Sequence, residues 1–335
     1  MTRGQGALAV ALLAAAGCRA TPIPAAARYP AGTEFQARYV TLDSTPIRYI
    51  DAGTGLPVIF LHGLGGSLYA WRHTLRPVKA AGFRVIAFDN RGLGFSGKPA
   101  RGYDNGAYTR LVVALLDSLH LSDAVLVGHS FGGAIAADVA VEHPRRVRGL
   151  VLIGAAGLGA REPLLFRVAR WPVVGPLALA FRGRGLTERL LRSAYADPDK
   201  VTPADVDQYY APVAEPDYGR ALRAVLREFR FDALSGRLDR IQAPTLLLWG
   251  EEDRWIPPAL GRLMASEIPR SAVLTVAHAG HNVAEEAPDE VNRLLIQFLK
   301  QGVPRAPPDL ALGTPGPYVS STRWLNTSGR EAQAQ

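Results

Sequence analysis

Short runs of apolar residues recur along the middle of the chain, and stretches with the apolar spacing of helices separate them. Six of the runs contain almost no polar residue, which is typical of strands buried on both faces of a mostly parallel sheet. These predicted strands are residues 58–61, 85–88, 124–127, 150–153, 245–248 and 273–276. Helices are predicted after several of them, for example at residues 108–119, 131–143 and 289–300. The alternation predicts an α/β fold with a doubly wound, mostly parallel sheet.

Two segments depart from this alternation. Residues 37–53 alternate between polar and apolar positions, which predicts a solvated antiparallel hairpin at one edge of the sheet. In residues 158–239 the strand pattern stops and helical spacing continues, so an inserted helical cap is predicted between two strands. The cap begins with the apolar stretch 161–181, in which arginines and prolines argue against a membrane span. The apolar face of this stretch is expected either to pack on the core, or to line a substrate pocket or touch lipid.

The two ends of the chain differ from its middle in composition. Residues 19–35 are rich in alanine and proline and are predicted to be a tether, whereas residues 301–335 are rich in proline, glycine and serine and are predicted to be an irregular or disordered tail. The predicted organisation is a signal segment at 1–18, the tether at 19–35, an α/β core at 36–157 and 240–300, the cap at 158–239 and the tail at 301–335.

The overall composition is that of a globular protein. The chain has 335 residues, of which 48% are hydrophobic, and this excludes disorder for most of its length. The formal net charge is +8, yet the lysines and arginines are scattered and form no long basic run. Because no nucleic-acid-binding motif accompanies the charge, we expect attraction to anionic surfaces and no nucleic-acid partner.

The first 18 residues have the pattern of an export signal. Arg3 supplies positive charge, and the small apolar residues 7–16 follow in a run too short for a bilayer, which needs about 20 residues. Cys18, the single cysteine of the chain, comes just after this run. The arrangement resembles the lipobox of bacterial lipoproteins, although Ala15 stands where leucine is usual, and it implies a lipid anchor on Cys18. A plain cleavable signal is the alternative. We expect an exported protein of the bacterial cell envelope, held at the outer membrane or the periplasmic face.

One serine lies in a run of glycines and small apolar residues. Ser130 is the middle residue of Gly128-His129-Ser130-Phe131-Gly132, between a predicted strand and a predicted helix. This is the context of a Gly-x-Ser-x-Gly nucleophile elbow, in which small neighbours permit a strained turn that exposes the hydroxyl. The alternative is a crowded turn in which the serine is only a small residue.

A nucleophilic serine needs a base, and the base needs an acid that fixes its tautomer. Asp253 comes just past a predicted strand, and His281 lies in the loop after the next strand. The chain order Ser130, Asp253, His281 is the order expected on this architecture. His278 is a rival base, but His281 follows Gly280 directly before a helix start, and we therefore predict that His281 is the base.

A glycine-rich loop, FLHGLGGSLYAWR, leaves the predicted strand 58–61. Glycines let backbone N–H groups approach a ligand, so the amides of Leu64 and Phe131 are predicted to form an oxyanion hole. A tight strand-to-helix turn is a compatible structural interpretation. His62 is expected to orient this loop rather than to transfer protons.

Residues 37–300 resemble the α/β-hydrolase superfamily, and specifically its capped serine-nucleophile members. The matching motifs are HGLGGS, DNRGLGFSGKP, GHSFGG, WGEEDRWIP and GHNVAEEAP. Similar members include esterases, monoacylglycerol lipases, meta-cleavage-product hydrolases and cofactor-free perhydrolases. Epoxide hydrolases and haloalkane dehalogenases use an aspartate nucleophile, commonly followed by tryptophan, and Ser130 with Phe131 disfavours those activities. No motif for a metal, a phosphate or a dinucleotide is present, so no cofactor and no metal are expected.

The resemblance and the three candidate residues imply a serine hydrolase that forms an acyl-enzyme. The expected substrate is a carboxylic ester with an apolar acyl or alcohol part, as in lipases and esterases, because the cap is apolar and a lipid anchor would hold the enzyme at a membrane. A carbon–carbon bond hydrolase of the meta-cleavage-product type is the alternative enzyme. A non-catalytic ligand-binding member of the fold is the alternative outside catalysis.

Overall fold

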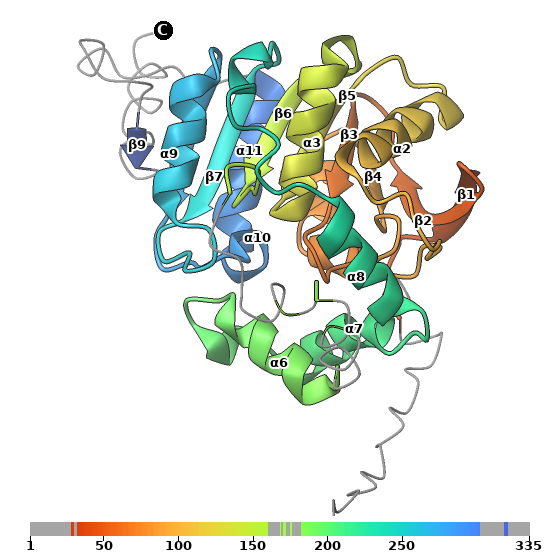
Figure 1. Cartoon of the computed structure of the whole chain (residues 1–335). Helices are drawn as coiled ribbons and strands as arrows, with labels where there is room; N and C mark the ends of the chain where they lie inside the picture. Colours follow the sequence, from red (N-terminus) through yellow and green to blue (C-terminus); the bar gives the residue numbers. More distant parts are fainter. Residues whose placement is uncertain are drawn as a thin grey trace, which may run out of the picture.

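A computed structural model gives the arrangement of the chain (Figure 1). It describes residues 28–29, 32–159, 168, 170–171, 175 and 182–301, together with the backbone of residues 318–320. The predicted signal segment with Cys18 lies outside the described residues, as do most of the predicted tether, the apolar stretch 161–181 and the predicted tail.

A sheet of nine strands forms the centre of the described part of the chain. The strands are β1 (Ala37–Leu42), β2 (Thr45–Ala52), β3 (Pro57–Leu61), β4 (Arg84–Phe88), β5 (Ala124–His129), β6 (Val147–Ile153), β7 (Thr245–Gly250), β8 (Ser271–Val276) and β9 (Tyr318–Ser320). Their order is β1-β2-β4-β3-β5-β6-β7-β8-β9, with β1–β2 and β2–β4 antiparallel and the other pairs parallel. The mostly parallel sheet with an antiparallel hairpin at one edge confirms the predicted fold class.

The strand β9 lies within the segment that the sequence analysis predicted to be irregular. Its three residues pair in parallel with β8, at the edge opposite the hairpin. The segment is short and directly follows Pro317, so it lacks the alternating or continuous apolar run by which a strand is recognised in a sequence.

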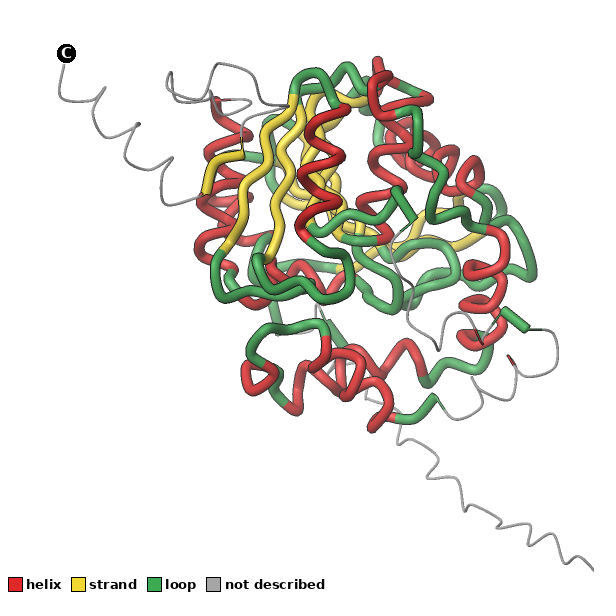
Figure 2. Tube along the Cα trace, turned by 60° about the vertical axis from the view of Figure 1, so that its left-hand side comes forward, coloured by secondary structure: helices red, strands yellow, loops and turns green. Residues whose placement is uncertain are grey.

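Helices cover both faces of the sheet (Figures 1 and 2). Outside the cap they are α1 (Leu75–Ala80), α2 (Asn105–Ser118), α3 (Phe131–Glu142), α9 (Pro258–Glu267), α10 (Val283–Glu286) and α11 (Pro288–Gln301), with short 3₁₀ turns at Leu68–Trp71, Pro144–Arg146 and Leu238–Arg240. Side chains of α2, α3 and α9 belong to one hydrophobic cluster, and those of α1, α10 and α11 belong to the other. Because helices lie on both sides, β5 and β7 bury every residue, as their uninterrupted apolar runs predicted.

The cap helices α6 (Arg184–Ser193), α7 (Pro203–Val213) and α8 (Tyr218–Glu228), with a 3₁₀ turn at Pro198–Lys200, lie between β6 and β7 in the chain and group beyond one end of the sheet (Figure 1). A reciprocal capping box between Thr202 and Asp205 fixes the start of α7. The apolar side of α8 joins the core cluster through Leu222, Val225 and Leu226. None of the helices in the described ranges has the length and apolar content needed to cross a membrane.

Candidate active site

Ser130 occupies the turn between β5 and α3, and its backbone is strained. Its φ of +52° with ψ of −115° lies in a region that L residues rarely adopt. The turn is tight because Gly128 and Gly132 have no side chains. A Cβ on Gly128 would lie 2.4 Å from the carbonyl oxygen of Gly132, and a Cβ on Gly132 would lie 2.2 Å from that of Leu61. The glycines of the motif therefore allow β5, α3 and β3 to approach closely enough to present the serine.

Gly132→Ala is expected to destabilise the fold. The added methyl group overlaps the carbonyl of Leu61, so β3 and α3 must separate, and overpacking of this kind costs about 1–3 kcal/mol or more. We expect the Tm, measured by differential scanning fluorimetry, to fall by about 3–10 °C. Gly185→Ala is the matched control, because a methyl group there meets nothing within 4 Å. Equal melting of the Gly132→Ala and wild-type proteins would contradict the close approach of the two elements.

The structure brings Ser130, His281 and Asp253 into one hydrogen-bonded chain. His281 Nε2 lies 2.9 Å from Ser130 Oγ, and His281 Nδ1 lies 2.8 Å from Asp253 Oδ2. The other carboxylate oxygen, Asp253 Oδ1, accepts from the backbone N–H groups of Trp255 (2.9 Å) and Ile256 (2.8 Å). A carboxylate can only accept, so the proton of the imidazole is on Nδ1 and Nε2 is left to accept from the serine hydroxyl.

The rival histidine is far more exposed than its neighbour. The side chain of His278 is 94% exposed, and its Nδ1 lies 3.9 Å from Glu252. The side chain of His281 is only 3% exposed. The structure therefore places His281, and not His278, at the serine.

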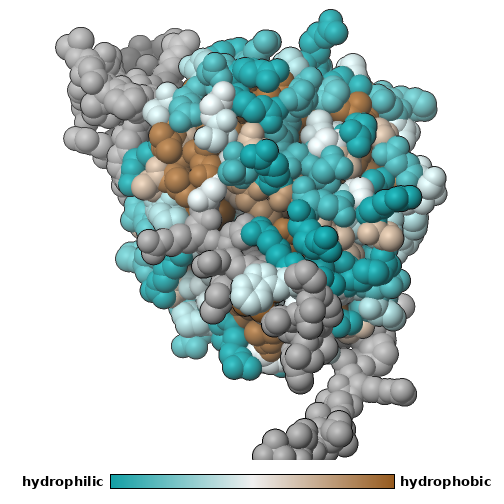
Figure 3. Space-filling view, in the orientation of Figure 1, coloured by the Kyte–Doolittle hydropathy of each residue, from teal (hydrophilic) through white to brown (hydrophobic). Residues whose placement is uncertain are grey.

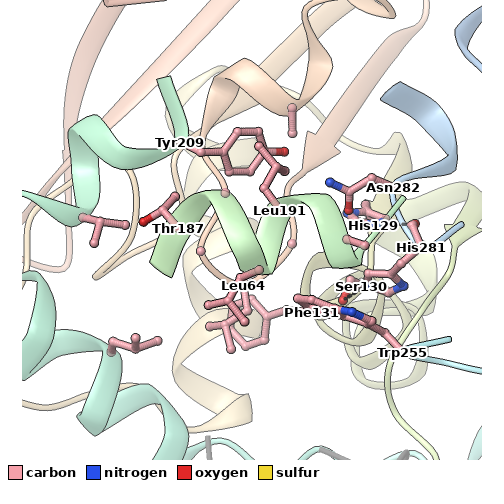
Figure 4. Close-up of a pocket in the computed structure, with 18 of the residues that line it drawn as sticks. Leu64, His129, Ser130, Phe131, Thr187, Leu191, Tyr209, Trp255, His281 and Asn282 are labelled. Atoms are coloured by element: carbon pink, nitrogen blue, oxygen red, sulfur yellow. Dashed lines mark hydrogen bonds between the residues drawn. The ribbon is translucent and has the colours of Figure 1, made fainter. Parts of the chain in front are cut away.

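Aromatic rings hold the His281 imidazole from both sides (Figure 4). The Trp255 ring stacks on it at 5.3 Å between centroids, and the His129 ring lies 4.9 Å away. His129 Nε2 lies 3.0 Å from the backbone carbonyl oxygen of His281, to which its N–H donates. Burial lowers the pKa of His129 to about 3, so this ring is neutral at physiological pH and adds no charge beside His281. The sequence analysis did not assign a role to either ring.

The glycine-rich loop after β3 is fixed by His62. The backbone N–H of Asn90 donates to His62 Nε2 at 2.9 Å, so the ring proton is on Nδ1, which donates to the Gly63 carbonyl at 2.8 Å. Burial lowers the pKa of His62, which keeps the ring neutral. His62 thus orients the loop, as the sequence predicted.

The predicted oxyanion donors both lie at the serine. Leu64 and Phe131 line the same pocket as Ser130 (Figure 4). Within the described ranges, neither backbone N–H has a hydrogen-bond acceptor. Two free donors beside a hydroxyl–imidazole–carboxylate chain are the elements that acyl transfer requires.

A family model described as the alpha/beta hydrolase fold matches residues 57–288. The chain belongs to the α/β-hydrolase fold family. The family resemblance drawn from the sequence motifs is therefore confirmed.

Dienoate hydrolases and a phospholipase are among the proteins to which this α/β-hydrolase is similar. The 2-hydroxy-6-oxo-6-phenylhexa-2,4-dienoate hydrolase of Comamonas testosteroni is 31% identical over 277 residues, which cover 76% of this chain and 91% of the relative. The crystal structure of a membrane phospholipase A, described as a bacterial virulence factor, is 29% identical with a TM-score of 0.68 and covers 79% of this chain and 86% of its own. A meta-cleavage product hydrolase from Pseudomonas fluorescens is 26% identical with a TM-score of 0.70, covering 79% and 97%.

Two adjacent glutamates tie the cap of the hydrolase to the loop that carries His281. Glu286 accepts from the backbone N–H of Gly280 at 2.7 Å and from the cap N–H groups of Ala196 (3.0 Å) and Asp197 (2.8 Å). The N–H of Asn282 donates to the cap carbonyl of Ala194 at 3.1 Å. The cap segment and the residues that flank His281 therefore share their hydrogen bonds, so displacement of one displaces the other.

Glu285 forms a second, charged connection between the cap and the core. It pairs with the mostly buried guanidinium of Arg72, whose side chain is 11% exposed and also lies 2.9 Å from the cap residue Asp205. The hydroxyl of Tyr209 in α7 donates to Glu285 at 2.5 Å. Burial raises the pKa of Glu285, opposed by the Arg72 charge. In the sequence, both glutamates stand out only as part of the family motif GHNVAEEAP. The visible signal was that both glutamates directly follow the apolar pair Val283-Ala284.

The pocket in front of Ser130 is predominantly apolar (Figure 4). Leu186, Leu190 and Leu191 reach it from α6, Val213 from α7 and Leu222 from α8. The face seen in the space-filling view is mostly hydrophilic, with hydrophobic residues gathered in separate patches (Figure 3). No cluster of metal-ligating side chains occurs among residues that the structure describes. The arrangement suits a substrate with an apolar group beside the bond that reacts.

Proposed function

We propose that this hydrolase cleaves carboxylic esters whose acyl or alcohol part is apolar. The observation that carries the proposal is the hydrogen bond of 2.9 Å between Ser130 Oγ and His281 Nε2, at the wall of an apolar pocket. The predicted signal ending at Cys18 supports a location in the cell envelope, where apolar esters occur as lipids. The likeness to a membrane phospholipase A supports the same substrate class.

In the proposed mechanism, His281 takes the proton of Ser130 as the oxygen attacks the ester carbonyl. The N–H groups of Leu64 and Phe131 stabilise the oxyanion, and loss of one such donor typically costs about 3–4 kcal/mol of transition-state stabilisation. Asp253 stabilises the imidazolium, which then protonates the leaving alcohol. Water, deprotonated by His281, hydrolyses the acyl-enzyme and regenerates Ser130.

A carbon–carbon bond hydrolase is the second candidate. The relative from Comamonas testosteroni supports it, since that enzyme is named for a dienoate substrate. A dienoate carries a carboxylate, and Arg182 is the one residue with a permanent charge, a positive one, among the described residues that line the pocket. Arg182 Nε donates to the Val213 carbonyl at 3.1 Å. Arg182 can pair with such a carboxylate and thus supports the second candidate, whereas the otherwise apolar lining favours the ester.

A substrate panel separates the two activities. We expect turnover of p-nitrophenyl esters from acetyl to long acyl chains, with kcat/KM rising as the acyl chain fills the leucine-lined pocket. The competing assay follows absorbance loss of 2-hydroxy-6-oxo-6-phenylhexa-2,4-dienoate. If the dienoate were turned over faster than every ester, the carbon–carbon bond hydrolase would be the better-supported function. Binding of either compound without turnover, together with no labelling by a fluorophosphonate, would point to the non-catalytic alternative.

A further inference from the structure

Two tyrosines of the cap line the pocket, and only one of their hydroxyl groups has a hydrogen-bond partner among the described residues. The hydroxyl of Tyr209 in α7 donates to Glu285 at 2.5 Å. Tyr218, the first residue of α8, is only 3% exposed, and its hydroxyl has no hydrogen-bond partner in the described part of the chain. A structural role therefore accounts for the hydroxyl of Tyr209 but not for that of Tyr218.

The Tyr218 hydroxyl lies beside the oxyanion loop. A Cβ on Gly65 would be 3.7 Å from the Tyr218 oxygen, which is the only contact such an atom would make within 4 Å among described residues. Gly65 directly follows Leu64, whose free N–H is one of the two predicted oxyanion donors. The hydroxyl therefore lies beside the residue that follows a predicted oxyanion donor.

The Tyr218 oxygen is not among the buried side-chain polar atoms without a partner in the described residues, so water in the pocket can reach it in the free enzyme. A hydroxyl that loses such water without gaining another partner costs free energy. The phenyl ring of Tyr218 packs in the core cluster through apolar contacts that a phenylalanine would make equally well. Burial also raises the pKa of Tyr218, so the group keeps its proton and can donate. An apolar ester that displaces water from the pocket would leave this donor unpaired, whereas an ester with a second oxygen would pair it.

We propose that Tyr218 is a specificity-determining residue whose hydroxyl donates a hydrogen bond to a second oxygen of the substrate, within a few bonds of the scissile carbonyl. The inference rests on the proposed esterase function and narrows its substrate class. The preferred esters carry a further oxygen, either in the alcohol part, as in a glycerol ester, or in the acyl part, as in an alkoxy acid ester.

Tyr218→Phe tests the inference with three small esters: propyl butyrate, glycerol monobutyrate and propyl methoxyacetate. The quantity compared is the ratio of wild-type to variant kcat/KM for each ester, measured by pH-stat, so differences in intrinsic reactivity cancel. We expect the ratio for one oxygen-bearing ester to exceed that for propyl butyrate by about three- to tenfold, the usual effect of one neutral hydrogen bond. Which of the two esters responds identifies the side of the substrate that carries the oxygen.

Tyr209→Phe is the matched control, since it removes a hydroxyl from the same pocket that already has a protein partner. We expect Tyr209→Phe to lower the Tm and to affect the three esters alike, and Tyr218→Phe to melt with the wild type. A Tyr218→Phe protein that fails to fold would overturn the inference, because the hydroxyl would then have a structural partner. Equal ratios for all three esters would overturn it while leaving the esterase proposal intact. If the wild-type enzyme hydrolysed none of the three esters and none of the p-nitrophenyl esters, both the inference and the esterase proposal would fail.

Discussion

Ser130→Ala is expected to lower kcat/KM for p-nitrophenyl butyrate by at least about 10⁴-fold. The serine oxygen lies 2.9 Å from His281 Nε2. Without this hydroxyl, only water could attack the carbonyl, and water is not held in a fixed position beside the base. The residual activity would reflect only the oxyanion donors and substrate binding. Loss of this size, without a change in Tm, would identify Ser130 as the attacking group.

A covalent label gives an independent measurement for the same variant. A fluorophosphonate should modify the wild-type protein at Ser130 and leave Ser130→Ala unlabelled. Ser266→Ala serves as the matched control, because the Ser266 hydroxyl is bonded to the Leu263 carbonyl on the exposed side of α9. Retention of a tenth or more of the wild-type activity by Ser130→Ala would refute the assignment.

Asp253→Asn is expected to reduce kcat by about 10⁴-fold while preserving the fold. The amide oxygen of asparagine still accepts from Trp255 and Ile256, so the loop retains two of its hydrogen bonds. The amide NH₂, however, would donate to His281 Nδ1 and move the imidazole proton to Nε2. In that tautomer the ring has no lone pair facing Ser130 and cannot act as a base.

The control for Asp253→Asn is Glu252→Gln, which removes a neighbouring carboxylate that is 44% exposed and faces His278. We expect Glu252→Gln to retain wild-type kcat, measured in the same ester assay. If Asp253→Asn and Glu252→Gln gave similar rates, the carboxylate beside His281 would have no catalytic part and the proposed mechanism would fail.

Hydrogen bonds connect the cap to the loop that carries His281. Glu286 and Asn282 share hydrogen bonds with the cap segment at Ala194–Asp197, and Glu285 joins Arg72 and Tyr209. Buried networks of this kind are costly when one partner is removed. Variants of the cap are therefore expected to alter the position of His281 as well as the shape of the pocket.

Most of the strands and the three candidate residues were readable from the sequence. Uninterrupted apolar runs, such as that of β5, occur because a strand covered on both faces has no solvated side. The glycines around Ser130 were readable because the turn has no space for a side chain. Asp253 and His281 were found by their positions after consecutive strands, since parallel strands end at one edge of the sheet.

The polar groups in the pocket and the links between cap and core depend on contacts between segments that are distant in the sequence. The local pattern of residues does not predict such contacts. The side on which a cap helix faces the pocket follows from its packing, so neither the bonded hydroxyl of Tyr209 nor the unpaired one of Tyr218 was predictable. The strand β9 was missed because three residues have too few positions to show a period. The sequence by itself thus determined the mostly parallel sheet and the candidate residues Ser130, Asp253 and His281, because burial and backbone strain restrict the residue types at each position. Only the tertiary structure decided the substrate-facing polar groups and the links between cap and core, because these are set by how separately folded surfaces meet.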